Sequence, residues 1–188
     1  MSTTAAGIEL QPFYGPHGVE GPAGPGEYPF TRGRPTRPGA PPWILRELSG
    51  EGDARRSNAQ LKELLAHGAL GLDVIGDNPT QSALDPDHPM CTPAVGTNGV
   101  SLCRLIDFVE LLDGIPLDQV TLSHSLPAAF AIAGQYLAAS QLGFDPGVLR
   151  GSAIQGPMYT EDCSYAIFLP FDVRMRLTLD SIEFSLAQ

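Results

Sequence analysis

Apolar residues change from a helical to a strand spacing several times along the second part of the chain. Within 54–67, leucines recur three and four residues apart, as on one face of an amphipathic helix, and Gly68 follows as a stop signal. The same reasoning predicts three more helices: 102–113, 127–142 and a last one from 172 onward. We expect Ser101 and Asp172 to cap the first and the last of these. Short runs between the helices predict three strands: 72–77, 119–125 and 152–155. Alternating strands and helices indicate the α/β class, with parallel strands joined by right-handed crossovers.

The predicted strands are more polar than buried parallel strands, which are usually runs of Val, Ile and Leu. In 119–125 every second residue carries a hydroxyl group: Thr121, Ser123 and Ser125. In 72–77 two carboxylates share one face, those of Asp73 and Asp77. Two interpretations remain open. Either these faces line a polar channel that holds a ligand or water, or the strands lie at an edge with one face in solvent.

Residues 1–42 differ from the rest because they contain eight glycines and nine prolines. This composition excludes helices and central strands over most of the segment. It is typical of a disordered leader, yet the segment also carries four aromatic residues: Phe13, Tyr14, Tyr28 and Phe30. Since a plain linker has no need of aromatic side chains, we expect an extended arm that docks on another surface. The sequence thus predicts an arm at 1–42 and one domain at 43–188.

Charge and cysteine content narrow the class of protein. Eleven Lys and Arg against 21 Asp and Glu give a formal net charge of −10, which disfavours binding to the phosphate backbone of nucleic acids. The chain shows neither an apolar run long enough to cross a bilayer nor the features of a signal peptide. Its three cysteines are odd in number and widely spaced, as expected for free thiols. We therefore expect a cytoplasmic protein that binds neither nucleic acid nor membranes.

A series of short motifs runs through the chain. In sequence order they are 28–33 (YPFTRG), Pro42-Trp43 with Arg46, 57–59 (SNA), 71–72 (GL), Asp77 with 79–81 (PTQ), Asp85 with 87–89 (DHP), 113–118 (DGIPLD), 151–155 (GSAIQ), Phe168, Pro170 and 175–176 (MR). In this order and spacing they resemble the catalytic barrel of the methylmalonyl-CoA mutase large-subunit family, the cobalamin-dependent acyl-CoA mutases. The resemblance implies a partial TIM-type (β/α) barrel of about four units behind the Pro/Gly-rich arm.

The resemblance also implies roles for individual residues. In this family the pantetheine arm of coenzyme A threads the barrel axis, which would explain the polar strand faces. By position, Arg46 would contact coenzyme A. Four residues would line the channel or reach the acyl group: Thr121, Ser123, Ser125 and Gln155. The loop at Asp85, Asp87 and His88 would be a turn, as in the family, and we expect no metal site.

Several positions depart from the family pattern. Leu48 stands where the family has a tyrosine beside the reacting carbons, Asp73 replaces a serine, and Ala153 replaces a threonine. Tyr165 lies near the position of the arginine that binds the substrate carboxylate. We therefore expect that the free carboxylate of methylmalonyl-CoA is not held in a bidentate contact here.

Three residues are candidate catalytic groups: His124, Asp73 and Tyr165. Asp73 could form a carboxylate pair with Asp77 and titrate at a raised pKa. For His124 two interpretations remain: a core histidine under a helix or, if the strand twists at its end, a general acid or base.

Two classes of function follow from the resemblance. Family barrels have eight βα units, and a separate domain binds cobalamin through a DxHxxG motif that this sequence lacks. We expect no cofactor in this chain, with adenosylcobalamin only where a partner chain supplies it, and another chain or a second copy to close the barrel. The first class is a subunit of a split or reshaped mutase-like enzyme that binds an acyl-CoA or a carrier-bound acyl thioester, with isomerase or lyase chemistry completed by another chain. The second is a non-catalytic, degenerate subunit that stabilises a partner. The sequence does not decide whether the chain is an enzyme.

Overall fold

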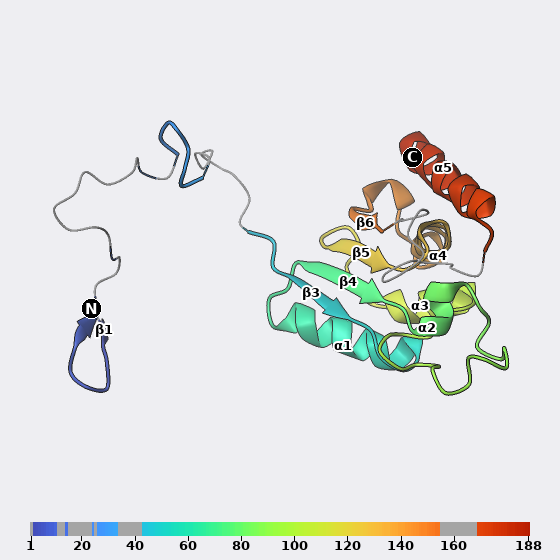
Figure 1. Cartoon of the computed structure of the whole chain (residues 1–188), viewed down its shortest axis with the longest axis horizontal. Helices are drawn as coiled ribbons and strands as arrows, with labels where there is room; N and C mark the ends of the chain where they lie inside the picture. The colour runs from blue at the N-terminus through green and yellow to red at the C-terminus, as the bar shows by residue number, and fades with distance from the viewer. Residues whose placement is uncertain (1, 11–13, 15–23, 25, 34–42, 155–168) are drawn as a thin grey trace. The chain divides into compact units, whose positions relative to one another are not determined.

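The computed structural model describes residues 2–10, 14, 24, 26–33, 43–154 and 169–188 (Figure 1). It divides the chain into two units, Met1–Trp43 and Ile44–Gln188, each of which has its own internal contacts. The predicted site residues Gln155 and Tyr165, as well as Cys163, lie outside the described residues.

The first unit contains two very short strands. β1 (Ser2–Thr3) and β2 (Glu9–Leu10) pair antiparallel, with Ser2 opposite Leu10. Farther along, the rings of Tyr28 and Phe30 meet edge to face with their centroids 5.9 Å apart. The extended, docking arm predicted for this segment stays a prediction.

The second unit alternates strands and helices. Its elements are β3 (Arg46–Ser49), α1 (Ala54–Ala66), β4 (Gly71–Ile75), α2 (Asn78–Ser82), α3 (Leu105–Leu112), β5 (Thr121–Ser125), α4 (Ala128–Gln141), the 3₁₀ turn η1 (Pro146–Val148), β6 (Gly151–Ala153) and α5 (Phe171–Ala187). The helices predicted over 54–67 and 127–142 are confirmed to within one residue at each end. β3 and α2 were not predicted.

Both predicted helix caps were wrong. The helix predicted over 102–113 begins only at Leu105, after Arg104 in an extended conformation. The carboxylate of Asp107, in the first turn, accepts the backbone N–H groups of Cys103 and Arg104 at 3.0 and 2.9 Å and thereby fixes the chain that leads into the helix. The last helix begins at Phe171, directly after Pro170, which places Asp172 within its first turn.

The four strands of this unit form one parallel sheet in the order β3-β4-β5-β6. Sequential strands are neighbours, and each crossover contains a helix: α1, then α2 with α3, then α4 (Figure 1). This topology confirms the α/β class and the parallel βα units. It is compatible with a partial β/α barrel, since a barrel is built from the same repeating unit.

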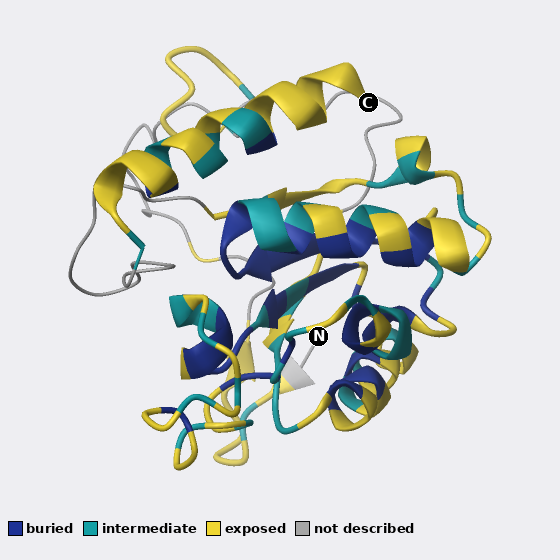
Figure 2. Ribbon diagram, turned by 90° about the vertical axis from the view of Figure 1, so that its right-hand side faces the viewer, coloured by how far each residue is buried: buried dark blue, intermediate teal, exposed yellow. Residues whose placement is uncertain are grey.

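The hydrophobic core lies between one face of the sheet and the helices α1, α3 and α4 (Figure 2). From the sheet it receives Leu72 and Val74 of β4 and Leu122 of β5, each at most 2% exposed. The largest buried helix side chains that meet them are Leu61, Phe108, Leu111 and Leu112. Gly134 of α4 packs on the ring of Phe108, where a Cβ atom would lie 2.5 Å from ring carbons. A glycine at this position therefore lets α4 approach α3 closely.

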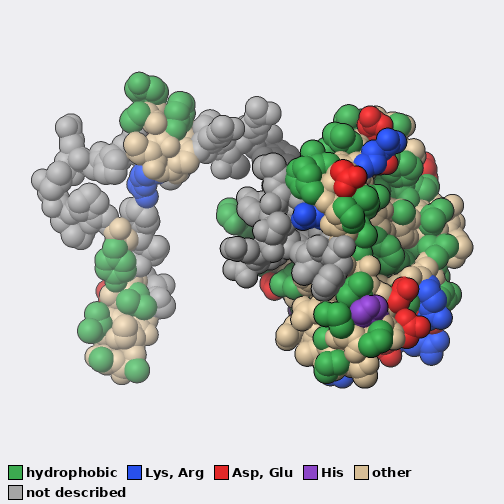
Figure 3. All heavy atoms as spheres, turned by 45° about the vertical axis from the view of Figure 1, so that its right-hand side comes forward, with side chains coloured by type: hydrophobic (Ala, Val, Ile, Leu, Met, Phe, Trp, Pro, Cys, Tyr) green, Lys and Arg blue, Asp and Glu red, His purple; other side chains and the backbone are tan. Residues whose placement is uncertain are grey.

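Charged side chains are interspersed on the surface of the second unit, with acidic and basic groups side by side on the face drawn in Figure 3. Ion pairs join Arg55 to Glu110 at 2.8 Å and Arg176 to Asp180 at 2.7 Å. Because these pairs are exposed, solvent and salt screen them and they contribute little to stability. Among the helices in the described ranges, none is both long and apolar enough to span a membrane.

Candidate functional site

The strand residues that face away from the core form a mainly polar face of the sheet, which we call the polar face. Its members are the polar residues Arg46, Asp73, Thr121, Ser123, Ser125 and Ser152 together with the apolar residues Leu48 and Ile75. The strand register orders them in rows across the sheet: Arg46, Gly71 and Thr121 in the first, Leu48, Asp73, Ser123 and Ser152 in the second, Ile75 and Ser125 in the third. Sequence periodicity had placed Thr121, Ser123 and Ser125 on one face, and the structure has them there.

The first row holds an arginine in a fixed position. Arg46 Nη2 donates a hydrogen bond to Thr121 Oγ1 at 2.9 Å, which spans the intervening strand β4. This contact passes over Gly71, where a Cβ atom would lie 3.0 Å from Thr121 Oγ1 and 3.1 Å from Arg46 Cβ. Because Gly71 has no side chain, β3 and β5 can exchange a hydrogen bond across it. A positive charge therefore lies at the amino ends of the strands.

Hydroxyl groups fill the middle of the polar face. Ser123 Oγ and Ser152 Oγ lie 2.8 Å apart and share a hydrogen bond between β5 and β6. Ser123 is 3% exposed, whereas Ser152 is exposed. Ser152 was not among the predicted site residues, because only the register of β6 against β5 shows that it faces Ser123. These groups can donate and accept hydrogen bonds without bringing a charge.

Asp73 contributes a carboxylate to the second row. Ser125 Oγ donates to Asp73 Oδ1 at 3.3 Å, on the diagonal between β5 and β4. Partial burial raises the pKa of the Asp73 carboxyl above its ordinary value, while the hydrogen bond from Ser125 and the charge of Arg46 act in the opposite direction. The carboxylate is thus partly desolvated and close to the serine hydroxyls.

Asp77 does not pair with Asp73. It follows β4, is fully buried, and caps α2, with Oδ1 accepting from the Thr80 backbone N–H at 2.9 Å and Oδ2 from that of Gly96 at 2.7 Å. Both carboxylate oxygens are therefore used to hold the backbone after the strand. The predicted carboxylate pair is wrong because β4 ends at Ile75 and the Asp77 side chain is directed to the backbone of Thr80 and Gly96 instead.

His124 lies on the side of the sheet opposite the polar face. Its Nε2 is 2.9 Å from Gln135 Oε1 on α4, and the residue is 1% exposed. Burial lowers the pKa of His124 from 6.5 to about 4, against a weaker opposing effect of the Gln135 hydrogen bond. The structure therefore does not bring His124 together with Asp73 or Ser123, and its position is that of a core histidine under a helix.

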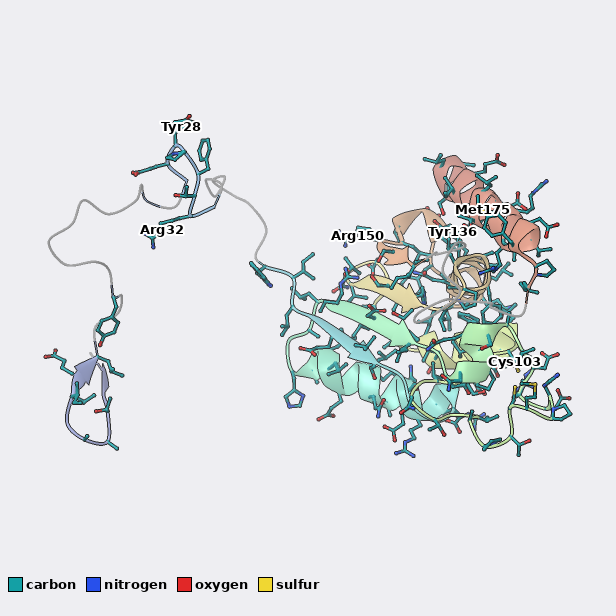
Figure 4. The ribbon with its side chains drawn as sticks, viewed as in Figure 1. Tyr28, Arg32, Cys103, Tyr136, Arg150 and Met175 are labelled. Atoms are coloured by element: carbon teal, nitrogen blue, oxygen red, sulfur yellow. The ribbon has the colours of Figure 1, made fainter. Side chains whose placement is uncertain are left out.

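The ring of His124 instead borders a small cavity of about 160 Å³ among β6, α4 and α5. Tyr136 of α4 and Arg150, which precedes β6, also line this cavity, and both are labelled in Figure 4. The ring of Tyr136 also meets that of Phe184 on α5, with the centroids 5.2 Å apart. His124 Nδ1 has no hydrogen-bond partner among the described residues. Ser152 of the polar face also lines this cavity, which therefore reaches the β6 edge of the sheet.

The loop with Asp85 and His88 is a series of turns. The backbone N–H of His88 donates to Asp85 O at 3.0 Å, and His88 Nδ1 accepts from the Met90 backbone N–H at 3.3 Å. In the part of the chain that the structure describes, no group of three or more His, Cys, Asp or Glu side chains is placed to hold a metal ion. Cys91 and Cys103 carry free thiols.

Comparison with known proteins identifies the family of the chain. The family model "Methylmalonyl-CoA mutase" matches residues 3–188. The methylmalonyl-CoA mutase large subunit of Streptomyces virginiae is 38% identical over 156 residues, which cover 79% of this chain and 21% of that protein. The 2-hydroxyisobutanoyl-CoA mutase large subunit of Aquincola tertiaricarbonis is 33% identical over 165 residues, which cover 86% of this chain and 29% of that protein. The methylmalonyl-CoA mutase of Escherichia coli K12 is 33% identical over 187 residues, which cover 95% of this chain and 26% of that protein. The chain thus spans between about a fifth and three tenths of the length of these relatives. The resemblance stated from the motifs is confirmed: the chain belongs to the methylmalonyl-CoA mutase family.

Proposed function

We propose that this chain supplies an acyl-CoA-binding surface of a methylmalonyl-CoA mutase-like isomerase, and that the polar face is this surface. The observation that carries the proposal is the order of the chemistry along the strands. Arg46 and Thr121 lie at the amino ends, Asp73, Ser123 and Ser152 share the middle row, and Ser125, which donates to Asp73, lies toward the carboxyl ends. The relatives are named as mutases that act on acyl-CoA thioesters, which agrees with this order.

Each part of the polar face suits one part of an acyl-CoA. The guanidinium of Arg46 is charged at every physiological pH and can pair with phosphate oxygens of the nucleotide. Thr121, Ser123 and, beyond the described residues, Gln155 offer neutral hydrogen bonds to the amides of a pantetheine arm. The acyl group would then reach the carboxyl ends of the strands, where β/α barrel enzymes carry out their chemistry.

Further strands would enclose the ligand. β3 and β6 are the edges of the described sheet, and edge strands present backbone groups that can pair with another strand. We propose that strands from another chain or from a second copy pair with these edges. In this arrangement the polar face becomes the wall of a channel.

The described histidines do not fit a role as ligands of cobalamin. His67 ends α1 with Nδ1 against Glu63, His88 is held in its turn, and His124 is buried under α4. None of the three belongs to the polar face, so we derive no step through this cofactor. Adenosylcobalamin, where it takes part, would be bound by residues other than these, which we assign to a partner chain.

The second candidate is a non-catalytic, acyl-CoA-independent subunit that stabilises a partner. It is favoured by Leu48, an apolar residue 58% exposed, at the position where the family has its active-site tyrosine. It is also favoured by the burial of His124, which leaves no described imidazole on the polar face. Binding of coenzyme A distinguishes the two candidates.

Calorimetric titration of the full chain with coenzyme A and with butyryl-CoA tests the proposal, with any partner chain that co-purifies present. We expect Arg46→Ala to weaken binding more than Ser123→Ala, because a charge-assisted contact contributes about 1.5–3 kcal/mol and a neutral one about 0.5–1.5 kcal/mol. The difference should shrink at high salt, which screens only the charged contact.

Ser123→Leu gives a second, steric test. Its isobutyl group would fill the space beside Ser152 Oγ and should abolish binding of both ligands. Ser140→Leu, at an exposed position of α4, is the matched control and should bind as the wild type does. Equal affinities for Ser123→Leu and wild type, or no binding by the wild type, would favour the non-catalytic candidate.

A further inference from the structure

The last helix, α5, carries apolar side chains on the side that faces solvent. Its buried side is partly polar, since Arg174 and Ser181 are each 7% exposed. On the outer side, Leu179 and Ile182 are each 52% exposed and Leu186 is 83% exposed. Figure 2 shows that the helix ending at the carboxyl terminus is exposed along most of its length. Because a surface helix normally has polar groups opposite its buried side, the outer side of α5 is suited to packing against a partner.

The exposed apolar residues have the spacing of a coiled coil. Met175, Leu179, Ile182 and Leu186 are separated by four, three and four residues, as positions d and a of a heptad repeat are. From the helical pitch, these four lie within about 60° of one another around the helix. We call them the α5 stripe; Met175, labelled in Figure 4, is half-buried and the other three are exposed. From the rise per residue, the stripe is about 17 Å long, enough to pack along a second helix.

The two borders of the α5 stripe differ in chemistry. One border carries opposite charges at the e positions, Arg176 and Glu183. The other carries hydroxyl groups at the g positions, Thr178 and Ser185. Arg176 pairs with Asp180 of the same helix at 2.7 Å, which occupies only part of its N–H donors. Glu183 is exposed and forms no ion pair with the residues that the structure describes, so the charged border has both a base and an acid to offer.

This pattern is complementary to itself when two copies of α5 run antiparallel. A two-fold axis between antiparallel helices brings the same border of each helix together, whereas parallel helices set one border against the other. We align Leu179 with Ile182 of the second copy, so that apolar residues meet along the stripe. In this register Arg176 lies near Glu183 of the second copy, and the two-fold axis repeats the contact. A parallel pair would set both charged residues against the hydroxyl border, so charge complementarity favours the antiparallel arrangement.

We propose that α5 is a dimerisation helix through which two copies of this chain associate antiparallel, with Arg176 of each copy beside Glu183 of the other. The inference is independent of the proposed function, because the polar face contains no residue of α5. A helix pair of this length buries less surface than a standard interface of about 1,600 Å², so the dimer is weak. We expect a dissociation constant of about 10–100 μM.

Sedimentation equilibrium of the full chain between about 1 and 500 μM, a range that brackets this constant, measures the association. The wild type should convert from monomer to dimer within the range. Leu179→Glu places a carboxylate at the centre of the α5 stripe and should leave the chain monomeric throughout. Leu137→Glu is the matched control, because Leu137 lies on α4, is 55% exposed and is outside the stripe. It should dimerise as the wild type does, and circular dichroism should show both variants folded.

Charge reversal tests the antiparallel pairing. Arg176→Glu and Glu183→Arg each replace two attractive contacts by two repulsive ones. Each variant alone should therefore dimerise about tenfold more weakly than the wild type. An equimolar mixture of the two variants should dimerise to within about threefold of the wild type, because every contact in the mixed dimer again joins opposite charges.

Three results would contradict the inference. A wild type that stays monomeric at every concentration would show that the α5 stripe does not bind a second copy, and would overturn it. A dimer that survives Leu179→Glu would overturn it too, since another surface would then hold the two copies together. If the mixture of the two charge variants dimerises no more tightly than either variant alone, the charged borders do not meet and the antiparallel arrangement is wrong.

Discussion

The two faces of the four-stranded sheet are built from the same strands and differ in what determines their residues. In β5, Leu122 and His124 point into the helix layer, and Ser123 and Ser125 point to the polar face. Leu122 is held by apolar packing, whereas Ser123 is held by a single hydroxyl contact with Ser152. Apolar packing thus determines which residues occupy the face of the sheet that is covered by the helices. On the other face Ser123 and Ser125 are also buried, but their recorded side-chain contacts are hydrogen bonds rather than apolar packing, and this is why we propose ligand binding there.

The largest difference should appear when one residue of each face is truncated. Leu122→Ala removes a side chain that is 2% exposed, and we expect it to lower the free energy of unfolding by about 2–5 kcal/mol. Ser123→Ala should lower it by about 1 kcal/mol or less, because the exposed hydroxyl of Ser152 can turn to water. Urea unfolding followed by circular dichroism measures both. A loss for Ser123→Ala as large as that for Leu122→Ala would show that the polar face is also part of the core.

His124 provides a second contrast between the two faces, because it is a titratable residue that is fully buried on the packed face of β5. Its pKa is 6.5 when unfolded and about 4 when buried, so the unfolded state binds more protons between these values. The contribution of the buried, uncharged His124 to the free energy of unfolding is complete above pH 6.5 and is lost as the pH falls toward 4. We expect the free energy of unfolding to drop by about 2 kcal/mol between pH 7 and pH 5 on account of this residue.

Two variants isolate the contribution of His124 from that of other titrating groups. His124→Leu cannot titrate and should lose most of this pH dependence, whatever its stability at pH 7. His67→Gln, at an exposed position after α1, should keep it. An unchanged pH dependence in His124→Leu would mean that the imidazole is accessible to protons in the folded state, which would reopen its role as an acid or base.

The sequence predicted most of the helices that pack on the sheet, but it missed the strand at the edge of the sheet and the shortest helix. Leucines spaced three and four apart gave α1 correctly, because burial against the sheet requires that spacing. β3 was missed because Arg46–Ser49 has one apolar residue and lies at the edge of the described sheet, where burial imposes little pattern. α2 was missed because five residues are too few for a periodicity.

The candidate site was predicted in composition but not in its contacts. Alternation along β5 suffices to place Thr121, Ser123 and Ser125 on one face. The hydrogen bonds that join Arg46 to Thr121 and Ser123 to Ser152 depend on strand order and register, which a single sequence does not state. The assignment of Arg46 and Gln155 came from family resemblance alone. Ser152 could have been found by pairing β6 with β5 before choosing site residues.

The smallest expected effect concerns Gly71, where the polar face depends on a missing side chain. A Cβ atom there would lie 3.0 Å from Thr121 Oγ1 and 3.1 Å from Arg46 Cβ, closer than ordinary contacts, so Gly71→Ala must push the two apart. We expect this to weaken their 2.9 Å hydrogen bond and to lower affinity for coenzyme A about threefold, the equivalent of about 0.7 kcal/mol, since Arg46 would no longer be held in position. Gly147→Ala is the matched control, because its Cβ atom would meet only the side chain of Asp145. Titrations at low and high salt should show the Gly71→Ala difference only at low salt, where the arginine contributes most. If Gly71→Ala lowers affinity equally at both salt concentrations, its effect does not pass through Arg46, and the charge at the amino ends of the strands is not what binds the nucleotide.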